Sequence, residues 1–267
     1  MIVVNPNAVD EALANPDLVK QLIDEVAAGS QLAAKVHRSL LPSPVRHPQI
    51  DVDVRYLPVD NVSGNYCQVR FPVPTICYIT ICEVRGHGIT PSLLATRVSS
   101  EVKHFISDRL RPMAVVRELN EFIYENFQDV NVSLSFIAAQ IDLDHRTISY
   151  SGAGHPGVLL LPNAGGRVCS LDSQNSLIGV SESCLSEEPE HTRALAEGDR
   201  LLFYTSGLLR AADAEGRPFG QAGLEQIASD VLSVGTFAMA DLILEEVARF
   251  RNRRPKTDKT LIVAEIK

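Results

Sequence analysis

The segment EVRGHG, Glu83 to Gly88, places a carboxylate, a guanidinium and an imidazole close together between glycines. It follows an apolar run, TICYITIC, that predicts a buried strand, and it precedes ITPSLLATRVSSEV, which predicts a helix. Polar side chains at such a turn are typical of a binding or catalytic site. Glu83 could help to hold Mg²⁺ or Mn²⁺, because these ions prefer oxygen ligands, but one carboxylate is too few.

On its own, this turn leaves alternatives open. Glu83 and His87 are four residues apart across a glycine turn, so they share no helical face and a zinc site of the zincin type is excluded. Glu83 could instead form a surface ion pair with Arg85, with the glycines serving the turn. Two other strand-end turns, GAGHPG at 152–157 and TSGL at 205–208, contain no carboxylate. The serine of TSGL lacks the G-x-S-x-G elbow, which argues against a serine nucleophile.

Composition limits the classes of function. The chain has 267 residues, 45% of them hydrophobic, and a net charge of −8 from 33 acidic and 25 basic residues. This acidic balance argues against a nucleic-acid partner. Five cysteines without a C-x-x-C pair suggest packed thiols in a reducing compartment. We find no apolar run of membrane-spanning length and no signal-peptide pattern, so we expect no membrane association and a cytoplasmic protein.

The chain divides into an N-terminal helical segment, 1–41, and a larger domain, 42–267. Apolar residues recur at helical spacing from 16 to 41, and the prolines of LLPSP then end the helix. The larger domain opens with three predicted strands, continues with two helices that begin near Thr90 (N-cap) and Pro112, and returns to hairpin-linked strands. Two helices, about 221–232 and 236–251, precede a last strand. This order predicts an α+β fold: an α/β sandwich of antiparallel sheets covered by helices.

Eight short motifs recur in a characteristic order, and together they resemble one known family. They are LLP (40–42), SGNYCQ (63–68), EVRGHG (83–88), LN (119–120), AGHPGVLL (153–160), EGDRLLFYTSG (197–207), FG (219–220) and TDKT (257–260). The sequence resembles the SpoIIE-like branch of the PPM-type, metal-dependent Ser/Thr protein phosphatases. The resemblance implies an α/β/β/α sandwich with a two-metal site at one end of the sheets, where a phosphoester is hydrolysed.

The departures from the family pattern fall on the metal ligands. Both aspartates of the family's G-G-D-[FY]-x-D motif are replaced, by Asn65 and Gln68, and the aspartate of T-D-G is Ser206. D-V-x-G-H-G keeps a carboxylate as Glu83, and D-D-x-T keeps one as Asp258. The resemblance therefore places a degenerate metal site at Glu83, Asp258, Asn65, Ser206 and the carbonyl of Val84, with weak or no binding of Mn²⁺ or Mg²⁺.

The replaced aspartates remove most of the negative charge that would offset the repulsion between two bound metal ions. Two dications about 4 Å apart repel by roughly 16 kcal/mol at an effective dielectric constant near 20, which Glu83 and Asp258 alone cannot offset. We therefore expect a catalytically impaired, regulatory phosphatase-like domain that binds a protein partner in bacterial signalling. The resemblance suggests a phosphorylated STAS-domain protein, in partner-switching control of sigma factors. Arg85 and His87 are the candidate contacts to a phosphate or partner, since a guanidinium can bind phosphate through two hydrogen bonds.

Two alternatives to this hypothesis remain. The domain could be an active, Mn²⁺- or Mg²⁺-dependent phosphoserine/phosphothreonine phosphatase with an atypical metal site at Glu83, Asn65 and Asp258. It could also be a structural module that forms a homodimer through its N-terminal helix.

Overall fold

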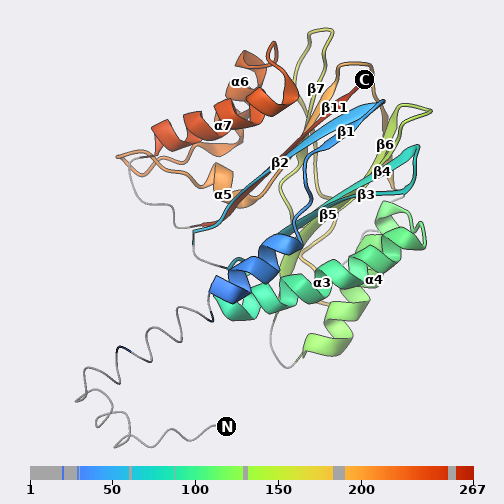
Figure 1. Ribbon diagram of the computed structural model, residues 1–267, viewed down its shortest axis with the longest axis vertical. Coiled ribbons are helices and arrows are strands. Elements are labelled where there is room, and N and C mark those ends of the chain that lie inside the picture. The colour runs from blue at the N-terminus through green and yellow to red at the C-terminus, as the bar shows by residue number, and fades with distance from the viewer. Residues whose placement is uncertain are drawn as a thin grey trace, which may run out of the picture.

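The protein is a four-layer sandwich in which two antiparallel sheets pack face to face and helices cover both outer faces (Figure 1). The computed structural model describes residues 20, 29, 31–59, 62–86, 88–128, 132–182, 190–251 and 257–267. The α/β/β/α sandwich expected from the sequence is confirmed. The division at residue 41 stays a prediction.

The first sheet has six strands in the order β1-β2-β11-β10-β7-β8, so the last strand of the chain lies at its centre. All neighbouring strands are antiparallel. The strands are β1 (Val45–His47), β2 (Ile50–Leu57), β7 (Val158–Leu161), β8 (Cys169–Leu171), β10 (Arg200–Tyr204) and β11 (Lys259–Ile266). Its outer face is covered by α5 (Ser206–Leu209), α6 (Gly220–Asp230) and α7 (Thr236–Phe250).

The second sheet has five antiparallel strands in the order β3-β4-β5-β6-β9. Its strands are β3 (Asn65–Val73), β4 (Ile76–Val84), β5 (Leu134–Asp142), β6 (Thr147–Ala153) and β9 (His191–Ala194). Helices α3 (Ile89–Ser107) and α4 (Pro112–Phe127) cover its outer face. Residues 31–39 are also helical, and the His37 ring nitrogen Nδ1 lies 3.4 Å from the Tyr56 hydroxyl of β2.

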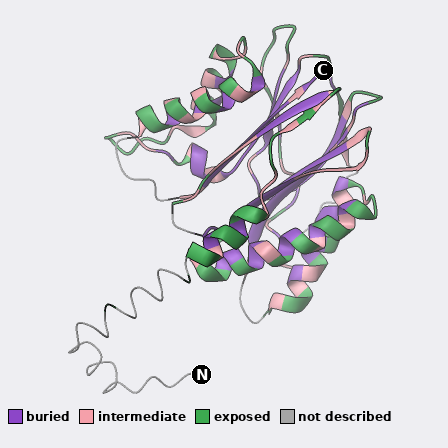
Figure 2. Cartoon of the chain, in the orientation of Figure 1, coloured by how far each residue is buried: buried purple, intermediate pink, exposed green. Residues whose placement is uncertain are grey.

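Three apolar layers hold these elements together. One lies between the two sheets, and the other two lie between each sheet and its helices, so the central strands are buried on both faces (Figure 2). The sequence shows this directly, because β4 is almost continuously apolar instead of alternating. These layers fix the two sheets relative to each other and to the helices, so the polar segments at the ends of the strands occupy defined positions.

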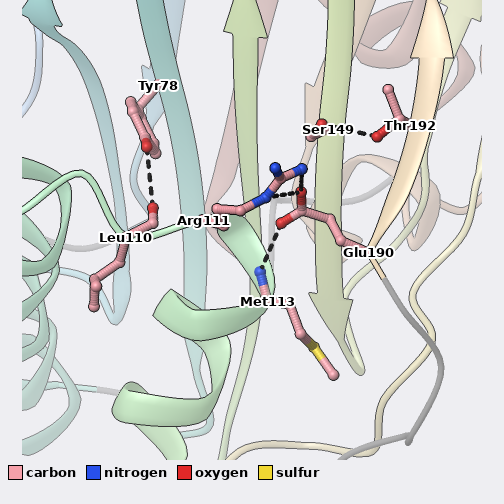
Figure 3. Close-up of polar contacts among 7 residues, drawn as sticks. All are labelled: Tyr78, Leu110, Arg111, Met113, Ser149, Glu190 and Thr192. Carbon is pink, nitrogen blue, oxygen red and sulfur yellow. Dashed lines mark hydrogen bonds and ion pairs between the residues drawn. The ribbon is translucent and has the colours of Figure 1, made fainter.

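Helix α4 is anchored at its first turn by Glu190, which precedes β9 (Figure 3). One carboxylate oxygen of Glu190 accepts a hydrogen bond from the Met113 amide at 3.1 Å, and the other accepts one from Arg111 Nε at 2.9 Å. The Tyr78 hydroxyl donates to the Leu110 carbonyl at 3.0 Å just before the helix. A carboxylate at a helix N-terminus satisfies a free amide and interacts favourably with the helix dipole. These contacts fix the start of α4 against the second sheet.

Several predictions of elements need correction. Helix α3 begins at Ile89 with Gly88 as its N-cap, so Thr90 lies inside the helix and is not the cap. The sequence did not indicate the short strands β1 and β9 or helix α5, because they are too short or too polar for a periodic pattern. Cys169 is exposed, whereas Cys67, Cys77 and Cys82 are buried thiols as expected. The part of the predicted N-terminal helix before residue 31 falls, apart from two residues, outside the described residues.

Within the described ranges, no helix combines the length and the apolar character needed to span a bilayer.

Candidate functional site

A cavity of about 430 Å³ opens at one end of the sandwich, where segments of both sheets meet. Asn65 at the start of β3 and Glu83 near the end of β4 come from the second sheet, and the turn after β10 and the residues before β11 come from the first. Its volume is in the range of small-ligand sites. The lining residues are Asn65, Glu83, Val84, Arg85, Gly86, Ser135, Gly154, Pro156, Leu177, Ser206, Arg210, Thr257 and Asp258.

Glu83 is held by the first turn of α5. The Ser206 hydroxyl donates to Oε1 of Glu83 at 2.8 Å, and the Ser206 amide donates to Oε2 at 3.1 Å. Both carboxylate oxygens are therefore engaged by neutral donors, each hydrogen bond to the charged group contributing about 1.5–3 kcal/mol. These hydrogen bonds fix the orientation of the carboxylate and use one acceptor position on each of its two oxygens.

Asn65 and Thr205 connect the two sheets at the floor of the cavity. Asn65 lies directly opposite Glu83 in the β3–β4 ladder, and its amide nitrogen donates to the Thr205 hydroxyl at 3.3 Å. Thr205 Oγ1 also accepts from the Thr260 amide at 3.0 Å, and the Thr205 amide donates to the Thr260 carbonyl at 3.1 Å. The Asn65 side chain is thus oriented by a hydrogen bond between two neutral groups.

Asp258 lies on the opposite wall and is partly engaged by the protein itself. Its Oδ1 accepts a hydrogen bond from the Val59 amide at 2.7 Å, which ties the end of the β2 segment to the start of β11. Gly207 lies behind it, where a Cβ atom would be 2.0 Å from the Asp258 carbonyl oxygen. Only glycine allows α5 and Asp258 to come this close.

The structure brings together most of the residues singled out in the sequence, but it arranges two of them differently. Arg85 forms no ion pair with Glu83: among the described residues its side chain has no hydrogen-bond or ion-pair partner, and Glu83 contacts Ser206 instead. Gln68 points away from the cavity, and its amide donates to the carbonyl and the hydroxyl of Ser99 in α3 at 2.6 and 2.8 Å. His87 lies outside the described residues.

Arg210 is the charged lining residue that the sequence did not reveal. It follows α5, and its amide donates to the Ser206 carbonyl at 3.1 Å. No motif marks this position, and only its place three residues after TSG could have drawn attention to it.

His155, from the AGHPG turn, is a structural residue beside this cavity. Its ring is buried, with Nδ1 3.1 Å from the Pro156 carbonyl, and Nε2 has no hydrogen-bond partner in the part of the chain that the structure describes. Burial lowers the pKa of His155 to about 4. The neutral imidazole therefore fits the folded state and the imidazolium does not.

We predict that His155 makes the fold sensitive to acid. Its pKa in the folded state lies below the unfolded value, so the contribution is complete above about pH 6.5 and is lost as the pH falls toward 4. Between pH 7 and 5 the free energy of unfolding should fall by about 2 kcal/mol from this group. Urea unfolding at the two pH values tests this, and His155→Gln should reduce the difference. An equal difference in both proteins would contradict the assignment.

A family model described as Stage II sporulation protein E (SpoIIE) matches residues 76–267, most of the chain. The chain belongs to the SpoIIE family. The phosphoserine phosphatase RsbP of Bacillus subtilis is 28% identical over 188 residues, which cover 67% of this chain and 44% of RsbP. This chain thus matches less than half of the length of that relative.

Solved structures show that the SpoIIE-family fold extends over nearly the whole chain. The PP2C domain of SiaA from Pseudomonas aeruginosa has a TM-score of 0.80, 18% identity, and coverage of 92% of this chain and 98% of that chain. A structure of the SpoIIE phosphatase domain of Bacillus subtilis with a fragment of its regulatory domain has a TM-score of 0.69 and 15% identity, covering 83% and 64% of the two chains. The resemblance to PPM-type phosphatases of the SpoIIE branch is confirmed.

The donor set of this SpoIIE-family site does not fit a pair of divalent ions. Two carboxylates line the cavity, Glu83 is bonded to Ser206, and Asp258 is bonded to Val59. Nowhere in the described part of the chain do three or more His, Cys, Asp or Glu side chains form a group that could hold a metal ion. Asn65 and Ser206 supply neutral oxygens, which complete a coordination shell but do not offset the charge of two dications.

Proposed function

We propose that this SpoIIE-family domain is a catalytically impaired, regulatory phosphatase-like protein that binds a phosphorylated protein partner. One observation carries the proposal: the carboxylate that remains at the metal-binding turn is bonded to Ser206, while Arg85, on the same cavity, has no partner among the described residues. The cavity therefore offers a free guanidinium in place of bound cations.

The chemistry of Arg85 supports a phosphorylated ligand. A guanidinium presents two parallel N–H donors that match the oxygens of a phosphate group, and it keeps its positive charge throughout the physiological pH range. Arg85 directly follows β4, and its amide donates to the Ser133 carbonyl at 3.2 Å, so its backbone is fixed while its side chain is exposed. This geometry suits the capture of a group presented by another protein.

The class of partner is inferred from the family. We propose a serine-phosphorylated STAS-domain protein in bacterial partner switching that controls a sigma factor. The name of the relative RsbP, a phosphoserine phosphatase, supports phosphoserine as the recognised group. Binding without hydrolysis would make this domain a competitor or a sensor of the phosphorylated partner.

The binding experiment compares a fluorescent phosphoserine peptide with its unphosphorylated form by anisotropy, in buffer without divalent ions. We expect the phosphorylated peptide to bind more tightly, and Arg85→Ala to weaken binding about tenfold or more through loss of a charged hydrogen-bond pair. Arg193→Ala, at an exposed arginine of β9 outside the cavity, is the matched control. Equal affinity of the two peptides for the wild-type protein would refute the proposal.

The presence of two carboxylates on one cavity keeps a second candidate function open. Glu83 and Asp258, with Asn65, could support an active Mn²⁺- or Mg²⁺-dependent phosphatase with an atypical site. This alternative requires the ion to bind Glu83 at acceptor positions that the Ser206 donors leave open, or to displace those donors.

A homodimer through the N-terminal segment is the third candidate. Leu32 and Val36, one helical turn apart, are 64% and 52% exposed, and an apolar face of this kind favours association. If it mediates dimerisation, deletion of residues 1–41 will change the mass measured by light scattering from that of a dimer to that of a monomer.

A further inference from the structure

A second arginine, contributed by the other sheet, lines the same cavity as Arg85. Arg85 follows β4 of the five-stranded sheet, and Arg210 follows α5, which continues from β10 of the six-stranded sheet. The amide of each arginine donates to a backbone carbonyl, Arg85 to Ser133 and Arg210 to Ser206. The two side chains therefore reach the cavity from fixed points on its two walls.

Both guanidiniums are free of internal partners within the ranges that the structure describes. Several other arginines form ion pairs with acidic residues, as Arg111 does with Glu190 and Arg217 with Asp213. Arg85 and Arg210 form none, although Glu83 and Asp258 line the same cavity. The two carboxylates are instead bonded to the backbone amides of Ser206 and Val59.

The positions of the charges favour an anion that enters from solvent. Arg85 and Arg210 are exposed, whereas Glu83 and Asp258 are half-buried. An incoming group therefore meets the guanidiniums first, and the neutral side chains of Asn65, Ser135 and Thr257 offer further polar contacts. Two guanidiniums together can bind several oxygens of a doubly charged phosphoryl group. A single arginine at an open site binds such a group only weakly.

We propose that Arg85 and Arg210 form a two-guanidinium site for a phosphoryl group, and that this site reads the phosphorylated side chain of the partner. The inference rests on the proposed function for the source of the phosphoryl group, but the anion site itself can be tested without a partner. Arg210 is then the residue that makes the cavity selective for a dianion over a carboxylate.

The anion site is tested with inorganic phosphate, by ³¹P line broadening or calorimetry in phosphate-free buffer. We expect saturable binding that weakens with rising salt, and a loss of about tenfold or more in each of Arg85→Ala and Arg210→Ala. Arg210→Lys should fall between the wild type and Arg210→Ala, because it keeps the charge but not the paired donors. Arg193→Ala should bind phosphate as the wild type does.

Two outcomes would overturn the inference: no saturable phosphate binding by the wild-type protein, or unchanged binding in Arg210→Ala. The phosphoserine peptide separates this failure from that of the proposed function. If peptide binding depends on Arg85 but not on Arg210, the two-guanidinium site is wrong and the proposed function stands. If phosphate binding needs both arginines but the phosphorylated peptide has no advantage, the anion site stands and the proposed function fails.

Discussion

Replacing Asn65, Ser206 and Thr257 together by aspartate is expected to give a protein whose melting temperature rises with Mn²⁺. The three substitutions raise the number of carboxylates that line the cavity from two to five. The new side chain at position 206 would lie close to Glu83, since the Ser206 hydroxyl is 2.8 Å from Oε1 of Glu83. Two carboxylates at about 4 Å repel by roughly 4 kcal/mol at a dielectric constant near 20, so the variant should be less stable than the wild type in EDTA.

The attraction of a bound Mn²⁺ ion to the carboxylates offsets their mutual repulsion. At a free Mn²⁺ concentration about 100 times the dissociation constant, binding stabilises the folded state by about 2.7 kcal/mol, which corresponds to a rise in Tm of roughly 5–11 °C for a domain of this size. The wild-type protein should shift by less than about 1 °C, because two partly engaged carboxylates hold the ion weakly. Differential scanning fluorimetry with and without Mn²⁺ measures both values.

The matched control adds Glu83→Gln to the triple variant. Removing this carboxylate should abolish most of the Mn²⁺-dependent shift while relieving the repulsion at position 206. Circular dichroism in EDTA establishes that each variant is folded. If the triple variant is folded but its Tm does not respond to Mn²⁺, the backbone positions of the cavity residues, and not only their side-chain types, are unsuited to a metal ion.

Substituting Gly207 by alanine is expected to destabilise the domain and disturb the cavity. The new methyl carbon would lie 2.0 Å from the Asp258 carbonyl oxygen and 3.2 Å from the Thr257 hydroxyl, and the nearer atom is backbone. Helix α5 or the start of β11 must therefore move. We expect a loss of about 3 kcal/mol in the free energy of unfolding, or roughly 6–12 °C in Tm.

Gly235→Ala provides the comparison, because a Cβ atom at Gly235 would meet nothing within 4 Å and the residue has a negative φ of −66°. This change at a helix N-cap should cost no more than about 1 kcal/mol. Unfolding by urea measures both variants. A Gly207→Ala protein as stable as Gly235→Ala would mean that α5 is loosely placed, and the hydrogen bonds of Ser206 to Glu83 would then not define the site.

Most helices and strands could be predicted from the sequence because the patterns that indicate them are local. The apolar run of β4, the proline at the start of α4 and the polar break between β5 and β6 each lie within one short segment. The pairing of individual strands is not local, so the element order predicted only a sandwich of antiparallel sheets, and the family resemblance added the order of its four layers. The edge strand β9, with its mostly exposed HTRA, has no periodic pattern to reveal it.

The candidate site was less predictable because it joins residues that are far apart in the sequence. Glu83 and Ser206 are 123 residues apart, so no spacing shows that the serine occupies both oxygens of the carboxylate. The sequence instead suggested Arg85 as the neighbour of Glu83, because the two are close in the chain. The role of Arg210 depends on how α5 turns the chain toward the cavity, which only the folded structure displays.

Phosphate release from a phosphoserine peptide in millimolar Mn²⁺, measured side by side for the wild-type protein and Glu83→Ala, tests whether this domain has lost phosphatase activity. We expect the wild-type protein to release phosphate no faster than Glu83→Ala. Metal-dependent release by the wild-type protein that disappears in Glu83→Ala would contradict it and identify the domain as an active phosphatase.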